Sequence, residues 1–289
     1  METGRVIKSY NSFFYVETDD GLLACRIRGK LKRDRRGVGS VCPGDIVEYS
    51  RLPDGTGVVE RPLERKSLLR RPAVANVDQV VLTFAAAQPD LHSLLLNRFL
   101  VLAEWSGIPS IIVCINKMDL AKSREVLSEY GKLYPIIRVS AKEKDGIEEL
   151  RKCLAGKVTV LAGPSGVGKS SLLNALDSGL KLATGEVSEK ILRGRHTTRV
   201  AELLPYEGGF IADTPGFSAM ELSGLEPVEL AGCFPEFLPY LGKCRFSPCT
   251  HSHEPDCAIK MAVDDGEIFS ERYEAYISIL EEISQKSTR

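Results

Sequence analysis

Two different hydrophobic periodicities divide the chain. Residues 5–18, 22–29 and 40–49 are short runs rich in β-branched and aromatic side chains, separated by turn-forming Gly, Asp and Pro. Short strands at this spacing predict a small β-barrel, and we expect one of the OB type. From residue 76 to residue 217, apolar strands alternate with helical segments. That alternation predicts a parallel sheet flanked by helices.

The second half of this pattern can be followed element by element. Strands are predicted at 77–85, 110–116, 135–141 and 157–163, and helices at 91–105, 125–133, 146–154 and 168–176. Residues 200–213 predict a hairpin, and a final helix is expected near 267–284. The resulting fold class is multidomain α/β, and we expect domains at 1–66, 67–220 and 221–289.

Composition narrows the class of protein without naming it. Hydrophobic residues make up 43% of the chain and charged residues 27%, as in ordinary folded proteins. No apolar run approaches the roughly 18 residues of a membrane helix, and the first residues lack the apolar core of a secretory signal. We expect a cytoplasmic monomer that does not associate with membranes.

The net charge of -1 hides an uneven distribution. Residues 1–72 carry 15 basic and 10 acidic side chains, whereas residues 221–289 carry 6 basic and 13 acidic ones. The basic N-terminal residues could bind a polyanion, whereas the acidic C-terminal residues would repel one.

A glycine-rich segment after a predicted strand carries the strongest chemical signal. Residues 163–170 read GPSGVGKS and match the P-loop pattern, in which bare backbone N–H groups and a helix N-terminus surround phosphates. Lys169 is expected to hold the β- and γ-phosphates, and the Ser170 hydroxyl to bind Mg²⁺. The residues predicted to contact the nucleotide here are Gly163, Pro164, Ser165, Gly166, Val167, Gly168, Lys169, Ser170 and Ser171.

A second motif selects guanine over adenine. Asn116, Lys117 and Asp119 form an N-K-x-D sequence after the strand at 110–116. The Asp119 carboxylate can accept from both the ring N–H and the amino group of guanine, a pair of donors that adenine does not present. Ser140 and Ala141 resemble the fifth GTPase motif, in which a backbone N–H meets the guanine O6.

The remaining GTPase motifs follow the P-loop. Asp213 and Gly216 belong to a D-T-P-G sequence that resembles the third motif, with Asp213 toward Mg²⁺ and Gly216 toward the γ-phosphate. Thr198 lies in a polar stretch and resembles the switch threonine that closes on Mg²⁺. The base-reading motifs therefore precede the P-loop, which indicates a circularly permuted GTPase domain.

Three cysteines and a histidine gather near the C-terminus. Cys244, Cys249, His251 and Cys257 could supply three thiolates and an imidazole to a tetrahedral Zn²⁺. Because the four groups close the coordination sphere, the zinc is expected to be structural, with one ion per chain. His253 competes with His251 as the histidine ligand.

With these motifs the chain closely resembles the ribosome small subunit-dependent GTPase A family (RsgA, also called YjeQ). The resemblance rests on the permuted motif order, GRHTTR at 194–199, DTPGF at 213–217 and the cysteine cluster, whose matched histidine is His251. It implies an OB-fold, a permuted GTPase domain, a zinc-finger domain and a late role in maturation of the small (30S) ribosomal subunit.

Hydrolysis requires a group that positions water. Phe217 stands where Ras-type enzymes carry a glutamine, so His196 is the best polar substitute, and the resemblance also points to it. The predicted catalytic residues are therefore His196, Lys169 and Thr198, and a site this incomplete is expected to act slowly until a partner binds.

A basic segment in the predicted barrel completes the set of sites. Six positive side chains, Arg28, Lys30, Lys32, Arg33, Arg35 and Arg36, are expected to bind nucleic acid, and the resemblance implies that this is 16S ribosomal RNA. The leading function is GTP hydrolysis coupled to small-subunit assembly. The alternatives are a GTP-regulated module with another RNA target such as tRNA, a metabolic P-loop enzyme, and a non-enzymatic RNA-binding module.

Overall fold

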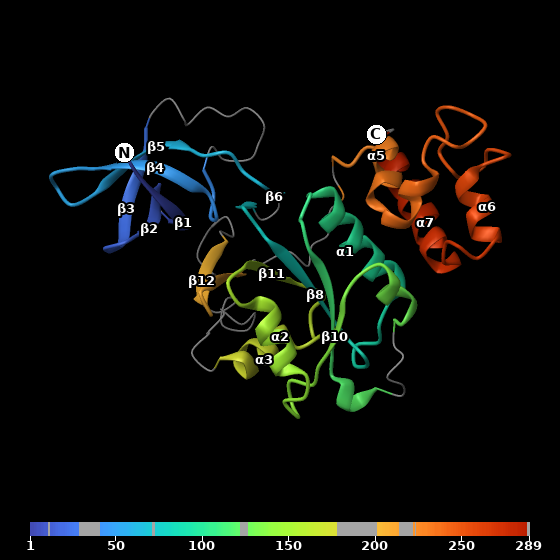
Figure 1. Cartoon of the computed structure of the whole chain (residues 1–289), viewed down its shortest axis with the longest axis horizontal. Coiled ribbons are helices and arrows are strands. Elements are labelled where there is room, and N and C mark those ends of the chain that lie inside the picture. The colour runs from blue at the N-terminus through green and yellow to red at the C-terminus, as the bar shows by residue number, and fades with distance from the viewer. Residues whose placement is uncertain are drawn as a thin grey trace.

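Strands with one buried face form a closed barrel at the N-terminal end of the chain (Figure 1). The barrel strands are β1 (Glu2–Tyr10), β2 (Phe13–Thr18), β3 (Gly21–Ile27), β4 (Ile46–Arg51) and β5 (Gly57–Pro62). They pair in the order β1-β2-β3-β5-β4, and β4 pairs back onto β1, which closes the barrel. Alternate residues such as Val6, Val16 and Val59 are fully buried inside. The expected OB-like barrel is confirmed.

The computed structural model describes residues 1–10, 12–28, 41–70, 73–121, 127–177, 201–213, 222 and 224–287. No described helix is both long and apolar enough to cross a membrane.

A mostly parallel sheet occupies the middle of the molecule. Its strands are β8 (Gln79–Ala85), β9 (Ile111–Asn116), β10 (Ile136–Arg138), β11 (Val158–Ala162), β12 (Glu202–Tyr206) and β13 (Gly209–Asp213), in the order β10-β9-β8-β11-β13-β12. Only β12 runs antiparallel within this part of the sheet, as the predicted hairpin with β13 requires. The carboxyl ends of the parallel strands therefore share one edge.

Helices cover both faces of this sheet. α1 (Ser93–Trp105) packs on one face, and α2 (Ile147–Leu154) and α3 (Lys169–Leu176) pack on the other. Neighbouring residues of β8 enter opposite cores, Leu82 on the α1 side and Val81 on the α2 and α3 side. A strand buried on both faces must be apolar throughout, which is why β8 and β9 read as continuous hydrophobic runs.

One predicted helix is wrong in type and extent. In place of a helix over 125–133, the described residues form a short 3₁₀ helix at Glu129–Lys132. Gly131 lies inside this segment and Pro135 follows it closely, and both residues disfavour a longer α-helix. Burial of Tyr130 in the core fixes the turn.

A buried ion pair fixes the segment by which the chain leaves the barrel. Asp45 is fully buried and accepts two hydrogen bonds from Arg65, at 2.6 and 2.7 Å, and a third from the Cys42 N–H at 2.8 Å. The same turn meets a small hairpin of β6 (Leu68–Arg70) and β7 (Ala73–Ala75), where the Ala75 N–H donates to the Pro43 carbonyl at 2.8 Å. β1 also pairs with β12 at Lys8 and Glu202.

The C-terminal part is helical and has a core of its own. Its α-helices are α5 (Pro227–Leu230), α6 (Ala258–Asp264) and α7 (Ser270–Ser287), with 3₁₀ helices at Ala231–Cys233 and Pro235–Tyr240. Leu230, Phe234 and Ile259 are fully buried in this core, and Val101 of α1 belongs to it as well. The helical module is thus packed against the helix that follows β8.

A buried arginine reinforces this contact. Arg272 of α7 is 1% exposed and donates to the Glu236 carboxylate at 2.6 and 3.1 Å. It also donates to Asn97 of α1, and its guanidinium lies 4.5 Å from the Phe234 ring centroid. Because a buried charge needs both a counterion and hydrogen bonds, this arrangement fixes α7 against α1.

Candidate functional site

The P-loop joins β11 to α3 at the carboxyl edge of the sheet. Gly163 has φ +142°, and a Cβ there would lie 2.0 Å from the Thr83 carbonyl oxygen. Gly168 has φ +92°, and its Cβ would lie 2.5 Å from the Asn116 amide nitrogen. Both positions therefore require glycine. The loop can pass this close to neighbouring strands only as bare backbone.

Lys169 is the first residue of α3 and curls back over the loop. Its ammonium donates to the Gly163 carbonyl at 2.7 Å and the Pro164 carbonyl at 2.8 Å. Burial lowers the pKa of Lys169, because a charged group loses hydration there. Ser170 and Ser171 follow in the first turn of α3. Unpaired N–H groups at this helix terminus and the nearby ammonium make a setting for an anion.

Asn116 joins three loops at one point. The side chain is 1% exposed, and its amide donates to the Val167 carbonyl at 2.9 Å. Its carbonyl oxygen accepts from the Ala141 N–H at 3.1 Å. The last residue of β9 therefore ties the P-loop to the loop after β10.

Asp119 is held by the same group of loops. The Ser140 hydroxyl donates to one carboxylate oxygen of Asp119 at 2.7 Å, and Ser140 in turn accepts from the Glu143 N–H at 3.1 Å. The Ser140 hydrogen bond holds the pKa of Asp119 below its ordinary value. Asp119 itself is exposed. An ionised, oriented acceptor thus faces solvent beside the P-loop.

Sequence reasoning missed the loop after β8. The Lys117 ammonium donates to the Gly166 carbonyl at 2.8 Å and also to the Gln88 carbonyl. Pro89 lies against the P-loop, 3.6 Å from a Cβ built at Gly166. The available signal was the position of this segment, since β8 is parallel to β11 and its neighbour in the sheet.

The other predicted site residues are placed in part or not at all. Asp213 ends β13, next to the P-loop strand β11, so its backbone reaches the same edge of the sheet. Gly216, His196 and Thr198 lie outside the described residues, as do most of the predicted RNA-binding positions: Lys30, Lys32, Arg33, Arg35 and Arg36. Arg28 is described, and it pairs with Glu60 on the barrel surface.

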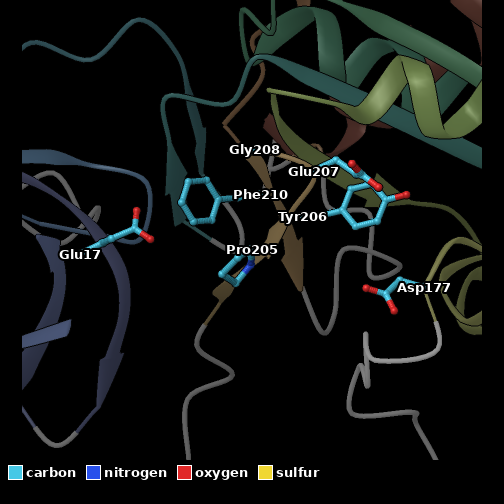
Figure 2. A pocket seen from close by; sticks show the side chains of 8 residues that line it. Glu17, Asp177, Pro205, Tyr206, Glu207, Gly208 and Phe210 are labelled. Atoms are coloured by element: carbon cyan, nitrogen blue, oxygen red, sulfur yellow. The ribbon is translucent and has the colours of Figure 1, made fainter. Parts of the chain in front are cut away.

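A hollow of about 450 Å³ lies between the barrel and the β12–β13 hairpin (Figure 2). Three carboxylates line it, Glu17, Asp177 and Glu207, and Glu17 projects from the barrel toward Pro205 and Phe210. Acidic walls repel phosphates. None of the residues predicted to bind the nucleotide lines this hollow, so we assign it no part in that site.

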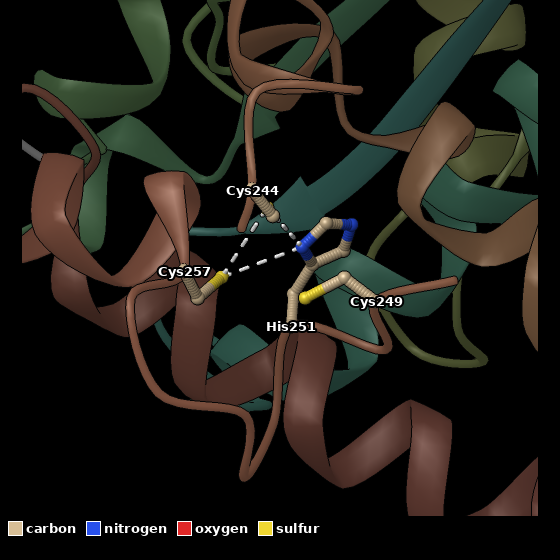
Figure 3. Close-up of side chains that lie close together, drawn as sticks. All are labelled: Cys244, Cys249, His251 and Cys257. Carbon is tan, nitrogen blue, oxygen red and sulfur yellow. Dashed lines mark hydrogen bonds between the residues drawn. The ribbon is translucent and has the colours of Figure 1, made fainter. Parts of the chain in front are cut away.

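The cysteine cluster assembles near α7 as its spacing predicted (Figure 3). One donor atom from each of Cys244, Cys249, His251 and Cys257 lies within 4.8 Å of the others. The Cys244 and Cys257 sulfurs are 3.8 Å apart, and His251 Nδ1 is 3.5 Å from the first and 3.4 Å from the second. Such a cluster could hold a metal ion. His253 is exposed and lies outside it.

Side chains of α7 hold the loop that carries His251. Tyr273 donates to the His251 carbonyl at 2.8 Å, and Tyr276 donates to the Thr250 carbonyl at 2.7 Å. Glu254 accepts from the Thr250 N–H at 2.7 Å and closes the turn. These hydrogen bonds orient the loop whose side chains could hold a metal ion.

Comparisons with known proteins agree with this arrangement. The family model described as RsgA GTPase matches residues 62–223, and that of the RsgA N-terminal domain matches residues 3–59. The small ribosomal subunit biogenesis GTPase RsgA of Shouchella clausii is 44% identical, with 100% of both chains covered. Its namesake from Thermotoga maritima is 45% identical over 97% of this chain and 96% of that protein.

Solved structures are similar over nearly the full length. The crystal structure of YjeQ from Thermotoga maritima has a TM-score of 0.82 and 40% identity, covering 97% of this chain and 98% of that one. The structure of YloQ, a circularly permuted GTPase, has a TM-score of 0.79 and 37% identity, covering 99% and 96%. From its matched domains, its permuted motif order and these likenesses, the chain belongs to the RsgA family of GTPases.

Proposed function

We propose that this protein hydrolyses GTP as an assembly factor of the small ribosomal subunit. The observation that carries the proposal is the hydrogen-bonded junction of three loops at Asn116, beside the oriented carboxylate of Asp119. This junction supports a site in which Asp119 reads guanine beside a loop that binds the phosphates. Curated relatives that share 42–45% of their residues with this chain carry the name small ribosomal subunit biogenesis GTPase. We also propose that the chain is divided into three domains, at residues 1–66, 67–220 and 221–289.

Within this site each residue has a distinct task. Asp119 accepts from guanine, Lys117 lies along the base, and Ala141 offers its N–H to the base oxygen. When GTP binds, the Lys169 ammonium gives up its hydrogen bonds to the carbonyls of its own loop and contacts the β- and γ-phosphates instead. The negative charge of the phosphates attracts the ammonium more strongly than neutral carbonyls do. Mg²⁺ would be held by Ser170, Thr198 and Asp213, and there it would neutralise developing charge on the phosphates.

His196 is our candidate for positioning the attacking water, with Thr198 closing on the γ-phosphate. Both residues stand in the segment between the P-loop and β12, next in the chain after α3. Because the position after Gly216 is the apolar Phe217, the usual glutamine is replaced. We expect a partner to complete the arrangement.

We assign binding of the ribosomal partner to the basic segment of the barrel. Arg28 follows β3 directly, and five more basic residues follow it by position 36. We assign these side chains to phosphates of 16S ribosomal RNA, which makes binding depend on salt. A monomeric state and a cytoplasmic location remain predictions from the sequence.

Zinc is the metal that fits the cysteine cluster. A tetrahedral zinc with metal–sulfur bonds of about 2.3 Å requires sulfur–sulfur edges of about 3.8 Å and slightly shorter sulfur–nitrogen edges. The distances of 3.8, 3.5 and 3.4 Å among Cys244, His251 and Cys257 meet that requirement, and the Cys249 sulfur lies within 4.8 Å of these three donors. Four protein donors leave no open position, so the ion would be structural and would cross-link the loop at 244–257.

Replacement of Cys257 by Ser is expected to abolish zinc binding and lower the stability of the helical module. If zinc is present at about a thousand times its dissociation constant, the lost free energy of unfolding is about 4 kcal/mol. Elemental analysis of wild-type protein should give one zinc per chain, and denaturant unfolding should give the loss of stability.

The matched control is Cys153→Ser, because Cys153 is a half-buried cysteine on α2 outside the cluster. It should keep its zinc and nearly all of its stability. A second pair, His251→Ala and His253→Ala, should differ in the same way. Full zinc content in Cys257→Ser would disprove the assignment.

The proposed function is tested by GTP hydrolysis with and without purified small subunits. Turnover should be slow for the protein alone and rise about 10³-fold with the subunit, as when a partner completes other GTPase sites. His196→Ala should remove most of this increase and leave nucleotide affinity nearly unchanged, because water positioning acts in the transition state. Large subunits and tRNA serve as comparison partners. Equal stimulation by tRNA would favour the other RNA target, and no stimulation by any of them would overturn the assembly role.

A further inference from the structure

The loop between β8 and α1 places a backbone oxygen on a lysine of the nucleotide site. The Lys117 ammonium donates to the Gly166 carbonyl of the P-loop at 2.8 Å and to the Gln88 carbonyl of this loop. Two carbonyls from separate loops therefore fix the end of one long side chain. Because a lysine stem is flexible, it keeps a single orientation only when its ammonium is held in this way.

Both residues of the contact have a left-handed backbone. The φ angle is +51° at Gln88 and +59° at Lys117. Residues that carry a Cβ rarely adopt such angles, whereas glycine adopts them without this steric cost. Gln88 is exposed, so packing of its own side chain does not require the conformation. Backbone strain of this kind persists where the surroundings enforce it, and it concentrates at functional sites.

Contacts on both sides of Gln88 enforce its conformation. The Ala86 N–H donates to the Asn116 carbonyl at 2.9 Å, which ties the start of the loop to the end of β9. On the other side, Pro89 lies against the P-loop, with a ring carbon 3.6 Å from a Cβ built at Gly166. The Gln88 carbonyl is thus held between the guanine-reading loop and the phosphate-binding loop.

We propose that Gln88 is a positioning residue that sets how long a guanine nucleotide stays bound. The inference rests on the proposed function, in which the Lys117 stem lies along the guanine ring. With its ammonium held by two carbonyls, that stem presents a fixed wall to one face of the base. Because the wall is ordered before the nucleotide arrives, binding costs less side-chain ordering. Gln88 stands outside the GTPase motifs and acts on the base through Lys117.

The test is a series of substitutions at Gln88 in the full-length protein. Gln88→Val should release GDP about tenfold faster, because a β-branched residue resists positive φ and the carbonyl then leaves the charged Lys117. Gln88→Asn should match wild type, since Asn tolerates the left-handed region. Gln88→Gly can keep or leave the conformation and should lie between the two. Displacement of fluorescently labelled GDP by excess unlabelled GDP gives the release rate.

Two further measurements show that Gln88 acts on the base and acts through Lys117. GDP and a non-hydrolysable GTP analogue carry the same base, so Gln88→Val should speed their release by the same factor. The single-turnover rate of bound GTP should stay near wild type, because the γ-phosphate is not involved. Lys117→Met keeps the stem and removes the donor. In that background Gln88→Val should add no further acceleration.

Glu207→Val is the matched control. Glu207 is an exposed residue with φ +45° in the turn between β12 and β13, outside the nucleotide site. The substitution introduces the same kind of backbone strain and should leave GDP release unchanged. Thermal unfolding without nucleotide should show that both valine variants lose some stability, whereas only Gln88→Val changes release.

Two results would overturn the inference. One is wild-type GDP release in a folded Gln88→Val, and the other is a full tenfold effect of Gln88→Val in the Lys117→Met background. If Gln88→Val does not fold, Gln88→Gly decides the question, because glycine relieves the strain and wild-type release would then reject the role. Tight GDP binding without any effect at Gln88 rejects only this inference, whereas a wild-type protein that does not bind GDP rejects the proposed function.

Discussion

Substitution of Asp119 by Asn should change the preferred base from guanine to xanthine. The Asp119 carboxylate accepts from two guanine donors, whereas an Asn amide must donate at one of these points. Xanthine carries an oxygen there and can accept. A site that loses a required hydrogen bond rejects a ligand strongly, so we expect the ratio of GDP to XDP affinity to fall by about 10⁴-fold. Titrations with GDP, XDP and ADP measure it.

The substitution is conservative for the loop itself. Ser140 donates to one Asp119 oxygen at 2.7 Å, and the Asn carbonyl can accept the same hydrogen bond. Glu143→Gln is the matched control, because Glu143 is an exposed carboxylate of the neighbouring loop that pairs with Lys142 at 3.4 Å. It removes the same charge and should keep the guanine preference. If Asp119→Asn binds GDP as wild type does, Asp119 does not read the base.

Loss of the Lys169 ammonium is expected to reduce GTP hydrolysis about a thousandfold. The charge on the transferred phosphate must be stabilised by groups already in position, and removal of one such group commonly costs 10²–10³-fold, at roughly 3–4 kcal/mol. Lys169→Met is the sharper variant, since it keeps the long apolar stem that helps fill the loop. Single-turnover hydrolysis with small subunits present gives the rate, and equilibrium titration gives the affinity.

A structural effect of this variant has to be excluded. Lys169 donates to the Gly163 and Pro164 carbonyls, so its loss could relax the loop. Lys152→Ala, an exposed lysine on α2, controls for the change in net charge and should hydrolyse GTP normally. Thermal unfolding of Lys169→Met should match wild type within a few degrees. Wild-type turnover in a folded Lys169→Met would show that this loop is not the phosphate site.

Local pattern in the sequence determined the elements and the chemistry they carry. The strands of the central sheet are continuous apolar runs because both of their faces are buried. The glycines of the P-loop can be recognised in the sequence because a positive φ requires them locally. The spacing of Cys244, Cys249 and Cys257 can be recognised because it keeps the ligands within reach of one ion. The prediction of a helix over 125–133 was wrong because a helix needs packing as well as a hydrophobic pattern, and because Gly131 and Pro135 disfavour an α-helix there.

Tertiary structure alone decided how distant segments meet. The N-K-x-D motif predicts that Asn116 ties its loop to the P-loop, but nothing in the surrounding residues specifies that the Ala141 N–H donates to Asn116, or that the Gln88 carbonyl accepts from Lys117. The same holds for the closure of the barrel through β4 onto β1, and for Arg272 between Asn97 and Glu236. These contacts depend on strand register and helix packing over long separations in sequence, which no short window of residues encodes.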